Sequence, residues 1–195
     1  MVTQIMTVKS DPISYFIQGL IETIGLEEFE KLAHSIVKPG GKNIKTIDPV
    51  RQRMDQVYGP DSARGIAICA GRAAFAHLLR QQENELGFTA ESFRFAPGKV
   101  KLKKGLVLLS KWMSSHFAEV VEVESKDKFW SFSITPKQKE QPSEVTSNLC
   151  DFKLGLLQGF LAWASGGKYF AIHEVACCCS GAEKCCYRIE KTPIE

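Results

Sequence analysis

Five of the chain's seven cysteines lie close together in one C-terminal segment. Thiolates are soft ligands, and several of them beside a carboxylate form a metal site more readily than they form ordinary core packing. In this segment Glu174, Cys177 and Cys185 are spaced three and then eight residues apart, with Gly181 between the two cysteines. The segment is therefore typical of a β-hairpin whose tight turn could hold a metal ion.

Strand geometry limits how many of these thiols can bind one ion. Alternate residues of a strand face opposite sides of its sheet, so Cys177 and Cys179 are expected to share a face from which Cys178 points away. Cys185 and Cys186 diverge for the same reason. All five thiols therefore cannot bind a single ion, and a tetrahedral site needs a ligand from elsewhere.

Three residues outside the core of the cluster bear on the ligand set. Glu174 and Cys177 would share a side only if the strand bends or ends between them. Cys150, at the start of a helical pattern, is the candidate for the remaining ligand. Cys69 lies among alanines in a longer helical pattern, and we expect it to be an ordinary core residue.

The composition is that of one well-cored domain. The 195 residues are 44% hydrophobic and 24% charged, which is ordinary for a globular protein. The net charge of +3 is too small to argue for nucleic acid as a partner. Lysines gather within residues 99–104, and we interpret them as a solvated surface.

Signals for export and membrane insertion are not evident in the sequence. No N-terminal leader pattern and no long uninterrupted apolar run is present, so we expect no transmembrane segment. An odd number of cysteines, several of them adjacent, favours reduced thiols over a disulfide framework. These features indicate a cytoplasmic protein, with a peripheral position at a membrane left open.

The pattern of apolar residues and breakers predicts an α+β fold with an antiparallel sheet of two hairpins packed by several helices. The predicted helices are residues 11–24, 26–37, 48–59, 61–86, 102–117 and 150–164. The predicted strands are residues 120–123, 129–134, 169–178 and 185–189.

Two of the helices carry signs of close packing. The first half of the helix at 61–86 is rich in glycine and alanine, so another backbone is expected to lie against it. The helix at 150–164 is apolar nearly all round and contains Gly155 and Gly159, which indicates a buried helix in close contact with another.

We expect residues 1–60 to form an N-terminal helical region that packs on a domain of residues 61–195. Phe16, Leu20 and Ile24 lie on one stripe of the first helix. Such a stripe suits a homodimer interface and core packing equally well.

The last quarter of the chain also resembles a known family. A cysteine opens a glycine-containing helix, and a Glu-x-x-Cys-x-x-x-Gly-x-x-x-Cys pattern follows. The residues that carry the pattern are Cys150, Gly155, Gly159, Glu174, Cys177, Gly181 and Cys185. In this pattern the chain resembles a standalone member of the vinyl-4-reductase domain family.

The resemblance implies a fold shared with TRAPP transport subunits and with the sensor domains of aromatic-responsive bacterial activators. It also implies a structural zinc ion, whose ligands would be Cys150, Glu174, Cys177 and Cys185. Four protein ligands leave no open position for catalysis. Cys178, Cys179 and Cys186 would then have no family role, unless Cys179 replaces Cys177.

The family further implies an apolar pocket beside the sheet. The residues expected to line it are Trp112, Trp130, Phe132, Phe152 and Leu156. Each of these five is also a good core residue on its own.

Three functions follow from the resemblance. The first is a binding protein for a small hydrophobic ligand, with a chlorophyll-type tetrapyrrole as the candidate and photosystem assembly or pigment biosynthesis as the setting. The second is a 4-vinyl reductase or a subunit of one, which the sequence favours less because it has no Gly-x-Gly-x-x-Gly motif for a hydride donor. The third is a TRAPP-like scaffold that acts through a homodimer or a related family subunit.

Overall fold

The computed structural model describes residues 12–34, 48–117, 119–137 and 150–194. Its helices are α1 (Pro12–Ile24), α2 (Leu26–His34), α3 (Asp48–Tyr58), α4 (Pro60–Gln82), α5 (Glu91–Arg94), α6 (Gly98–His116) and α7 (Cys150–Ala164). Its strands are β1 (Glu119–Ser125), β2 (Phe129–Pro136), β3 (Tyr169–Ala176) and β4 (Cys185–Ile194). The predicted α+β class is confirmed.

The four strands form one antiparallel sheet in the order β1-β2-β4-β3. Each predicted hairpin, β1–β2 and β3–β4, is present, and pairing of β2 with β4 joins the two. Phe132 of β2 lies opposite Tyr187 of β4, and Ile134 lies opposite Cys185. These four side chains are buried, so this face of the sheet belongs to the core and carries Cys185 at its end.

The described elements group into two compact units. The first contains α1, α2, α3, α4 as far as His77 and α7 as far as Leu157. The second contains the rest of α4 and α7, together with α5, α6 and the sheet. This grouping divides the continuous helices α4 and α7. It therefore does not test the predicted division at residue 60, which stays a prediction.

Glycines let α4 and α7 approach within the first unit. A Cβ atom added to Gly71 would lie 2.1 Å from the carbonyl oxygen of Phe152, and one added to Gly155 would lie 2.1 Å from that of Ile68. Real Cβ atoms do not come so close to backbone, so only glycine suits both positions. The predicted close backbone contact of the Gly/Ala-rich helix is confirmed.

The first helix completes the core of this unit. A Cβ atom on Gly19 would lie 2.1 Å from the carbonyl oxygen of Ala70, so α1 also meets α4 at backbone distance. Phe16 and Leu20 are fully buried, and the ring of Phe16 packs edge-on against Phe152 with 5.3 Å between centroids. Of the two uses left open for the apolar stripe of α1, core packing applies to Phe16 and Leu20.

An ionic cluster holds the start of α7. Asp151 accepts hydrogen bonds from Arg51 Nη1 at 2.7 Å and from Arg64 Nε at 3.1 Å. Arg51 also donates from Nε to Asp55 at 3.1 Å. Burial lowers the pKa of Arg51, but the hydrogen bonds to Asp151 and Asp55 outweigh it and raise the pKa above the ordinary arginine value. The residue next to Cys150 is therefore anchored on two sides.

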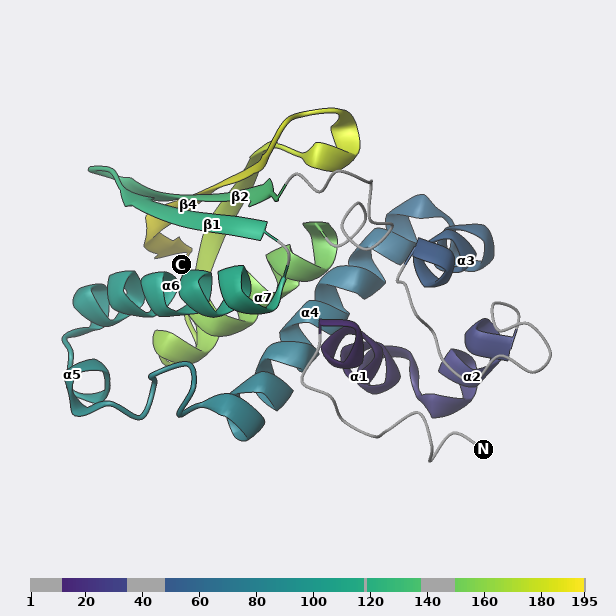
Figure 1. The fold of residues 1–195 in the computed structure, drawn as a ribbon, viewed down its shortest axis with the longest axis horizontal. Coiled ribbons are helices and arrows are strands. Elements are labelled where there is room, and N and C mark those ends of the chain that lie inside the picture. Colours follow the sequence, from purple (N-terminus) through teal and green to yellow (C-terminus); the bar gives the residue numbers. More distant parts are fainter. Residues whose placement is uncertain (1–11, 35–47, 118, 138–149, 195) are drawn as a thin grey trace. The chain divides into compact units, whose positions relative to one another are not determined.

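In the second unit, α6 lies along the sheet beside β1 (Figure 1). A Cβ atom on Gly105 of α6 would lie 2.4 Å from the ring of Phe160, so this helix also packs closely. Phe88 and Phe93 stack with centroids 4.8 Å apart, and Trp163 lies 5.1 Å from Phe88. An aromatic cluster thus fills the space between α5, α6 and the end of α7.

Several element ends differ from the predicted ones. The helix α6 begins at Gly98, four residues before the predicted start, and the short helix α5 was not predicted. Strand β3 ends at Ala176, before the cysteines, and β4 continues to Ile194. Among the described helices, none has both the length and the apolar character needed to cross a bilayer.

Candidate functional site

The cysteine-rich segment forms a tight turn between β3 and β4. Cys177 is extended, with φ −138° and ψ 134°, and it precedes a short 3-10 helix, Cys178–Ser180. Gly181 ends this helix in the left-handed region, at φ +87°, which favours glycine because a side chain is strained there. The predicted tight turn at Gly181 is confirmed, and it returns the chain to begin β4 at Cys185.

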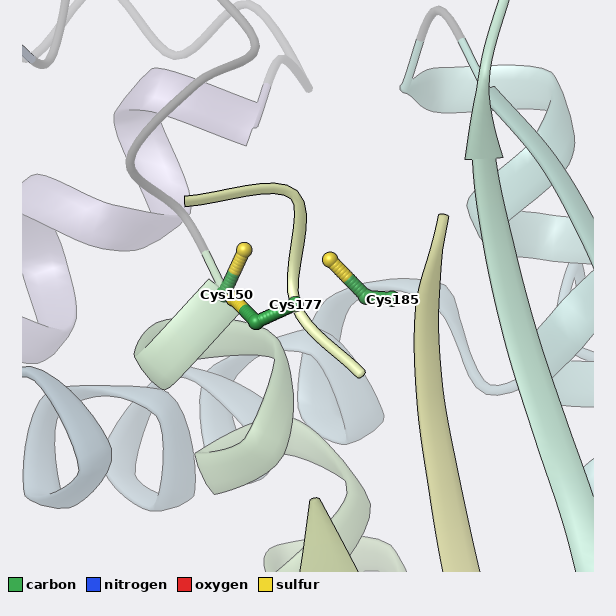
Figure 2. A group of neighbouring side chains, drawn as sticks. All are labelled: Cys150, Cys177 and Cys185. Carbon is green, nitrogen blue, oxygen red and sulfur yellow. The ribbon is translucent and has the colours of Figure 1, made fainter. Parts of the chain in front are cut away.

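Three thiols gather at this turn. The Sγ atoms of Cys150, Cys177 and Cys185 all lie within 4.8 Å of one another. Figure 2 shows the three side chains meeting from three separate segments of the chain. Cys150 and Cys185 are buried, and Cys177 is half-buried.

The spacing of the sulfurs suits a common ion. An ion bound at about 2.3 Å from each sulfur in tetrahedral geometry holds the sulfurs about 3.8 Å apart. Sulfurs within 4.8 Å of one another reach that separation by small changes in side-chain torsion. Thiolates are soft ligands, so this group selects thiophilic ions over Mg²⁺ or Ca²⁺.

The turn also supplies a hydrogen-bond donor to one sulfur. The backbone N–H of Cys178 donates to Sγ of Cys185 at 3.3 Å. A donor aimed at a thiolate compensates part of its negative charge. The backbone that positions Cys177 therefore also supports the charged form of Cys185.

Glu174 is not part of the group found among the described residues. It lies on β3, an edge strand of the sheet, and is exposed. The register of β3 against β4 shifts between Glu174 and Ala176, and the strand ends there. Of the four predicted metal ligands, three come together and Glu174 does not, so its assignment stays a prediction.

The other cysteines depart from the strand-based expectation. Because β3 ends at Ala176, the alternation rule does not apply to Cys177 and its neighbours, and that prediction was wrong. Cys178 lies in the 3-10 helix and is half-buried, as is Cys186 on β4. The side chain of Cys179 is outside the described part of the structure. Cys69 was expected in the core, but it is exposed on α4.

The five residues predicted to line a pocket are all buried in the cores of their units: Trp112, Trp130, Phe132, Phe152 and Leu156. Trp112 is engaged, since its Nε1 donates to Gln82 at 2.8 Å. The Nε1 of Trp130 is buried and has no acceptor among the described residues. The pocket-lining role of these residues stays a prediction.

All four histidines of the chain are described, and sequence reasoning gave them no role. The Nε2 atom of His77 lies 2.7 Å from Glu22, and that of His116 lies 3.2 Å from Glu85. The ring of His116 also stacks on Trp112, with 4.3 Å between centroids. His34 and His173 are exposed.

Comparison with known proteins identifies the fold. No family model matches the chain, and no curated protein matches it either. Among solved structures, it is similar to an H-NOX protein from S. oneidensis in the Fe(II)NO ligation state, with a TM-score of 0.63 and 12% identity over 93% of this chain and 99% of that one.

Two further solved structures agree. An oxygen-binding H-NOX domain related to soluble guanylate cyclases has a TM-score of 0.53 and 15% identity, covering 94% of this chain and 95% of that one. An H-NOX structure that probes heme distortion has a TM-score of 0.56 and 14% identity, with the same coverage. At such low identity the similarity shows the fold alone, which is that of H-NOX proteins.

This finding overturns the resemblance to the vinyl-4-reductase family. That resemblance rested on a spacing pattern in the last quarter of the chain, whereas the H-NOX similarity extends over nearly all of it. The functions drawn from the resemblance were therefore wrong: a tetrapyrrole-binding accessory factor in photosystem assembly or pigment biosynthesis, a vinyl reductase, and a TRAPP-like scaffold. The predicted structural zinc is likewise not supported, because the neighbours are described by Fe(II) ligation and heme.

Proposed function

We propose that this chain is a small-ligand sensor domain of the H-NOX fold, and that its responsive centre is a thiophilic metal ion held by Cys150, Cys177 and Cys185. The approach of these three sulfurs to within 4.8 Å of one another carries the proposal. The N–H group of Cys178, directed at Sγ of Cys185, supports it because the turn then stabilises a thiolate.

Three protein ligands distinguish this centre from a structural metal site. Structural sites of this kind are closed by four protein ligands, while sites that react keep one position for water or an exogenous ligand. Glu174 does not lie in the group, so the described ligand set has three members. In our proposal the fourth position is open to a small ligand, which is the property a sensor requires.

The fold neighbours also raise the question of haem. Haem iron in proteins is held by an axial His, Cys, Met or Tyr side chain. In this chain His77 is paired with Glu22. His116 is paired with Glu85 and stacks on Trp112, and the remaining two histidines are exposed. The histidines therefore do not fit an axial role, and no step of the proposed function passes through haem.

The proposal is tested by metal analysis followed by a ligand titration. The protein is purified without oxygen, its bound metals are measured, and the metal-free form is titrated with Co²⁺, whose thiolate complexes absorb in the near ultraviolet. We expect one ion per chain with thiolate-to-Co²⁺ absorption, and a further change in the visible bands when azide is added. The visible change reports the open coordination position.

Matched cysteine variants make the test specific. Loss of a residue that only supports a metal ligand weakens metal binding by up to about hundredfold. Cys185→Ser removes a ligand itself, so it should weaken Co²⁺ binding by more than about hundredfold. Cys69→Ser removes an exposed thiol outside the group and should leave binding unchanged. Equal binding by both variants would overturn the thiol assignment, and visible bands insensitive to azide would overturn the open position.

A further inference from the structure

A surface of the second unit combines cations with protruding apolar side chains. We call it the basic-aromatic patch, and its members are Arg94, Phe95, Lys99, Val100, Lys101, Lys103 and Lys104. These residues lie at the end of α5 and in the first two turns of α6. The segment 94–104 carries five cations and no acidic residue, whereas the whole chain has a net charge of only +3.

The apolar members of the patch are unusually open to solvent. Phe95 is 79% exposed and Val100 is 53% exposed, so neither contributes its side chain to the core. Trp163, which is 38% exposed, borders the patch because Lys101 Nζ lies 5.7 Å from the centre of its ring. Exposed apolar side chains that gather among charges are typical of surfaces that bind a partner.

No carboxylate of the described residues neutralises the cations of the patch. Among the residues that the structure describes, none of the five forms an ion pair with a carboxylate. Lys104 donates to the carbonyl oxygen of Ser92 at 3.0 Å, and Lys101 lies over the ring of Phe93. The charges of Lys99 and Lys103 are exposed to solvent.

The start of α6 adds an electrostatic cost that an anionic partner relieves. Its first turn contains no acidic residue, and Pro97 at the N-cap makes no side-chain hydrogen bond. Lysines beside the positive end of a helix dipole are unfavourable, and negative groups there are favourable. The cost is therefore offset when negative charge approaches this surface.

We propose that the basic-aromatic patch binds the surface of an anionic phospholipid membrane. Basic residues are attracted to anionic headgroups, and neighbouring aromatic and aliphatic side chains enter the boundary between headgroups and acyl chains. Phe95 and Val100 protrude beside cations, as this mode of binding requires. An acidic protein is the alternative partner, since it would neutralise the same cations. It would also need a pocket that fits the exposed side chain of Phe95, whereas a membrane accepts that side chain without a preformed pocket.

Vesicle sedimentation tests the proposal with the full chain. Phosphatidylcholine vesicles containing about 30% phosphatidylserine should bind the protein at low salt, and pure phosphatidylcholine vesicles should not. Lys99→Glu with Lys103→Glu should weaken binding at least about 30-fold, since each cation near an anionic surface contributes about fivefold. Lys168→Glu with Lys184→Glu makes the same charge change at exposed lysines elsewhere and should weaken binding by less than about threefold.

The apolar contribution is tested separately. Phe95→Ser should weaken binding about tenfold, while Tyr169→Ser, at another exposed aromatic residue, should not. The emission of Trp163 should shift to the blue on vesicle binding, because the other two tryptophans are already buried. Absence of vesicle binding, equal loss in the two lysine variants, or binding of an oligonucleotide or of polyglutamate in place of vesicles would overturn the proposal. Cys69→Ser, at an exposed residue outside the patch and the thiol group, should bind vesicles like the wild type.

Discussion

The backbone N–H of Cys178 lies 3.3 Å from Sγ of Cys185 and donates a hydrogen bond to it. This bond connects the 3-10 helix that follows β3 to the first residue of β4. The turn therefore has two functions at once, since it reverses the chain and fixes the position of a buried thiol. Its geometry depends on Gly181, which ends the 3-10 helix at φ +87°.

Gly181→Ala should destabilise the turn. A side chain in the left-handed region costs about 1–2 kcal/mol, and no neighbouring atom lies within 4 Å of the added Cβ to complicate the result. We expect a loss of that size in the free energy of unfolding, measured in urea, and weaker Co²⁺ binding. An alanine variant as stable as the wild type would show that the turn adopts another conformation.

Gly71→Ala and Gly155→Ala should each be strongly destabilising. Each new Cβ atom would lie 2.1 Å from a backbone carbonyl oxygen, so α4 and α7 would have to separate at a cost of about 1–3 kcal/mol or more. Urea unfolding of each variant measures this cost.

Gly65→Ala is the matched control in the same helix. A Cβ atom at Gly65 meets nothing within 4 Å, and alanine is the better helix former by about 0.5–1 kcal/mol. This variant should therefore be slightly more stable than the wild type. If all three alanine variants behaved alike, α4 and α7 would not touch at backbone distance.

Asp151→Asn should cost more than Asp55→Asn. Asp151 accepts hydrogen bonds from both Arg51 and Arg64 and its side chain is 17% exposed, whereas Asp55 accepts from Arg51 alone and is 38% exposed. Hydrogen bonds to charged groups contribute about 1.5–3 kcal/mol each when buried and less when exposed. We expect about 1–3 kcal/mol for Asp151→Asn and less than about 1 kcal/mol for Asp55→Asn in urea unfolding.

The pH dependence of the arginine's contribution follows from its pKa. The folded pKa of Arg51 is raised above its unfolded value, so its contribution to stability is complete below the unfolded pKa. That contribution is lost only as the pH rises through the folded value, at strongly alkaline pH. Between about pH 6 and pH 9, the difference in free energy of unfolding between wild type and Asp151→Asn should therefore stay constant. A difference that changed across that range would assign the effect to another group.

Metal removal should change the reactivity of the thiols. With the ion bound, Cys150, Cys177 and Cys185 should be protected from a disulfide reagent such as Ellman's reagent, while the exposed Cys69 reacts quickly. In protein that stays folded, a chelator should then make the half-buried Cys177 reactive first, because Cys150 and Cys185 are also protected by burial. Equal reactivity before and after chelation would contradict metal binding at these residues.

Local patterns in the sequence were enough for much of the fold. Apolar periodicity predicted both hairpins and the buried helix α7, and the Gly/Ala-rich run predicted the close contact now seen at Gly71 and Gly155. Proline and glycine were less informative about where helices begin. Pro97 and Gly98 are typical of a loop, yet they stand at the start of α6. The end of β3 at Ala176 was also missed, since apolar and cysteine residues continue past it without a change of pattern.

The candidate site was predicted in part. Residue types and spacing indicated a metal site in this segment with Cys150 as a candidate ligand, and the family resemblance implied Cys177 and Cys185; the sulfurs of these three residues lie together. Spacing could not establish where Glu174 lies relative to this group, because that depends on where the strand ends and on the register shift beside it. A motif confined to the last quarter of the chain could not identify the fold either, since the fold is defined by the order of elements along the whole chain.

X-ray absorption at the edge of the bound metal tests the central proposal most directly, because it counts the ligand atoms around the ion. For the wild-type protein purified without oxygen, we expect about three sulfur neighbours at about 2.3 Å and one lighter atom that azide replaces. Cys69→Ser should give the same spectrum, and Cys185→Ser should lose a sulfur or the metal itself. A shell of four sulfurs, a shell of nitrogen and oxygen only, or a protein that holds no metal would contradict the three-thiol centre.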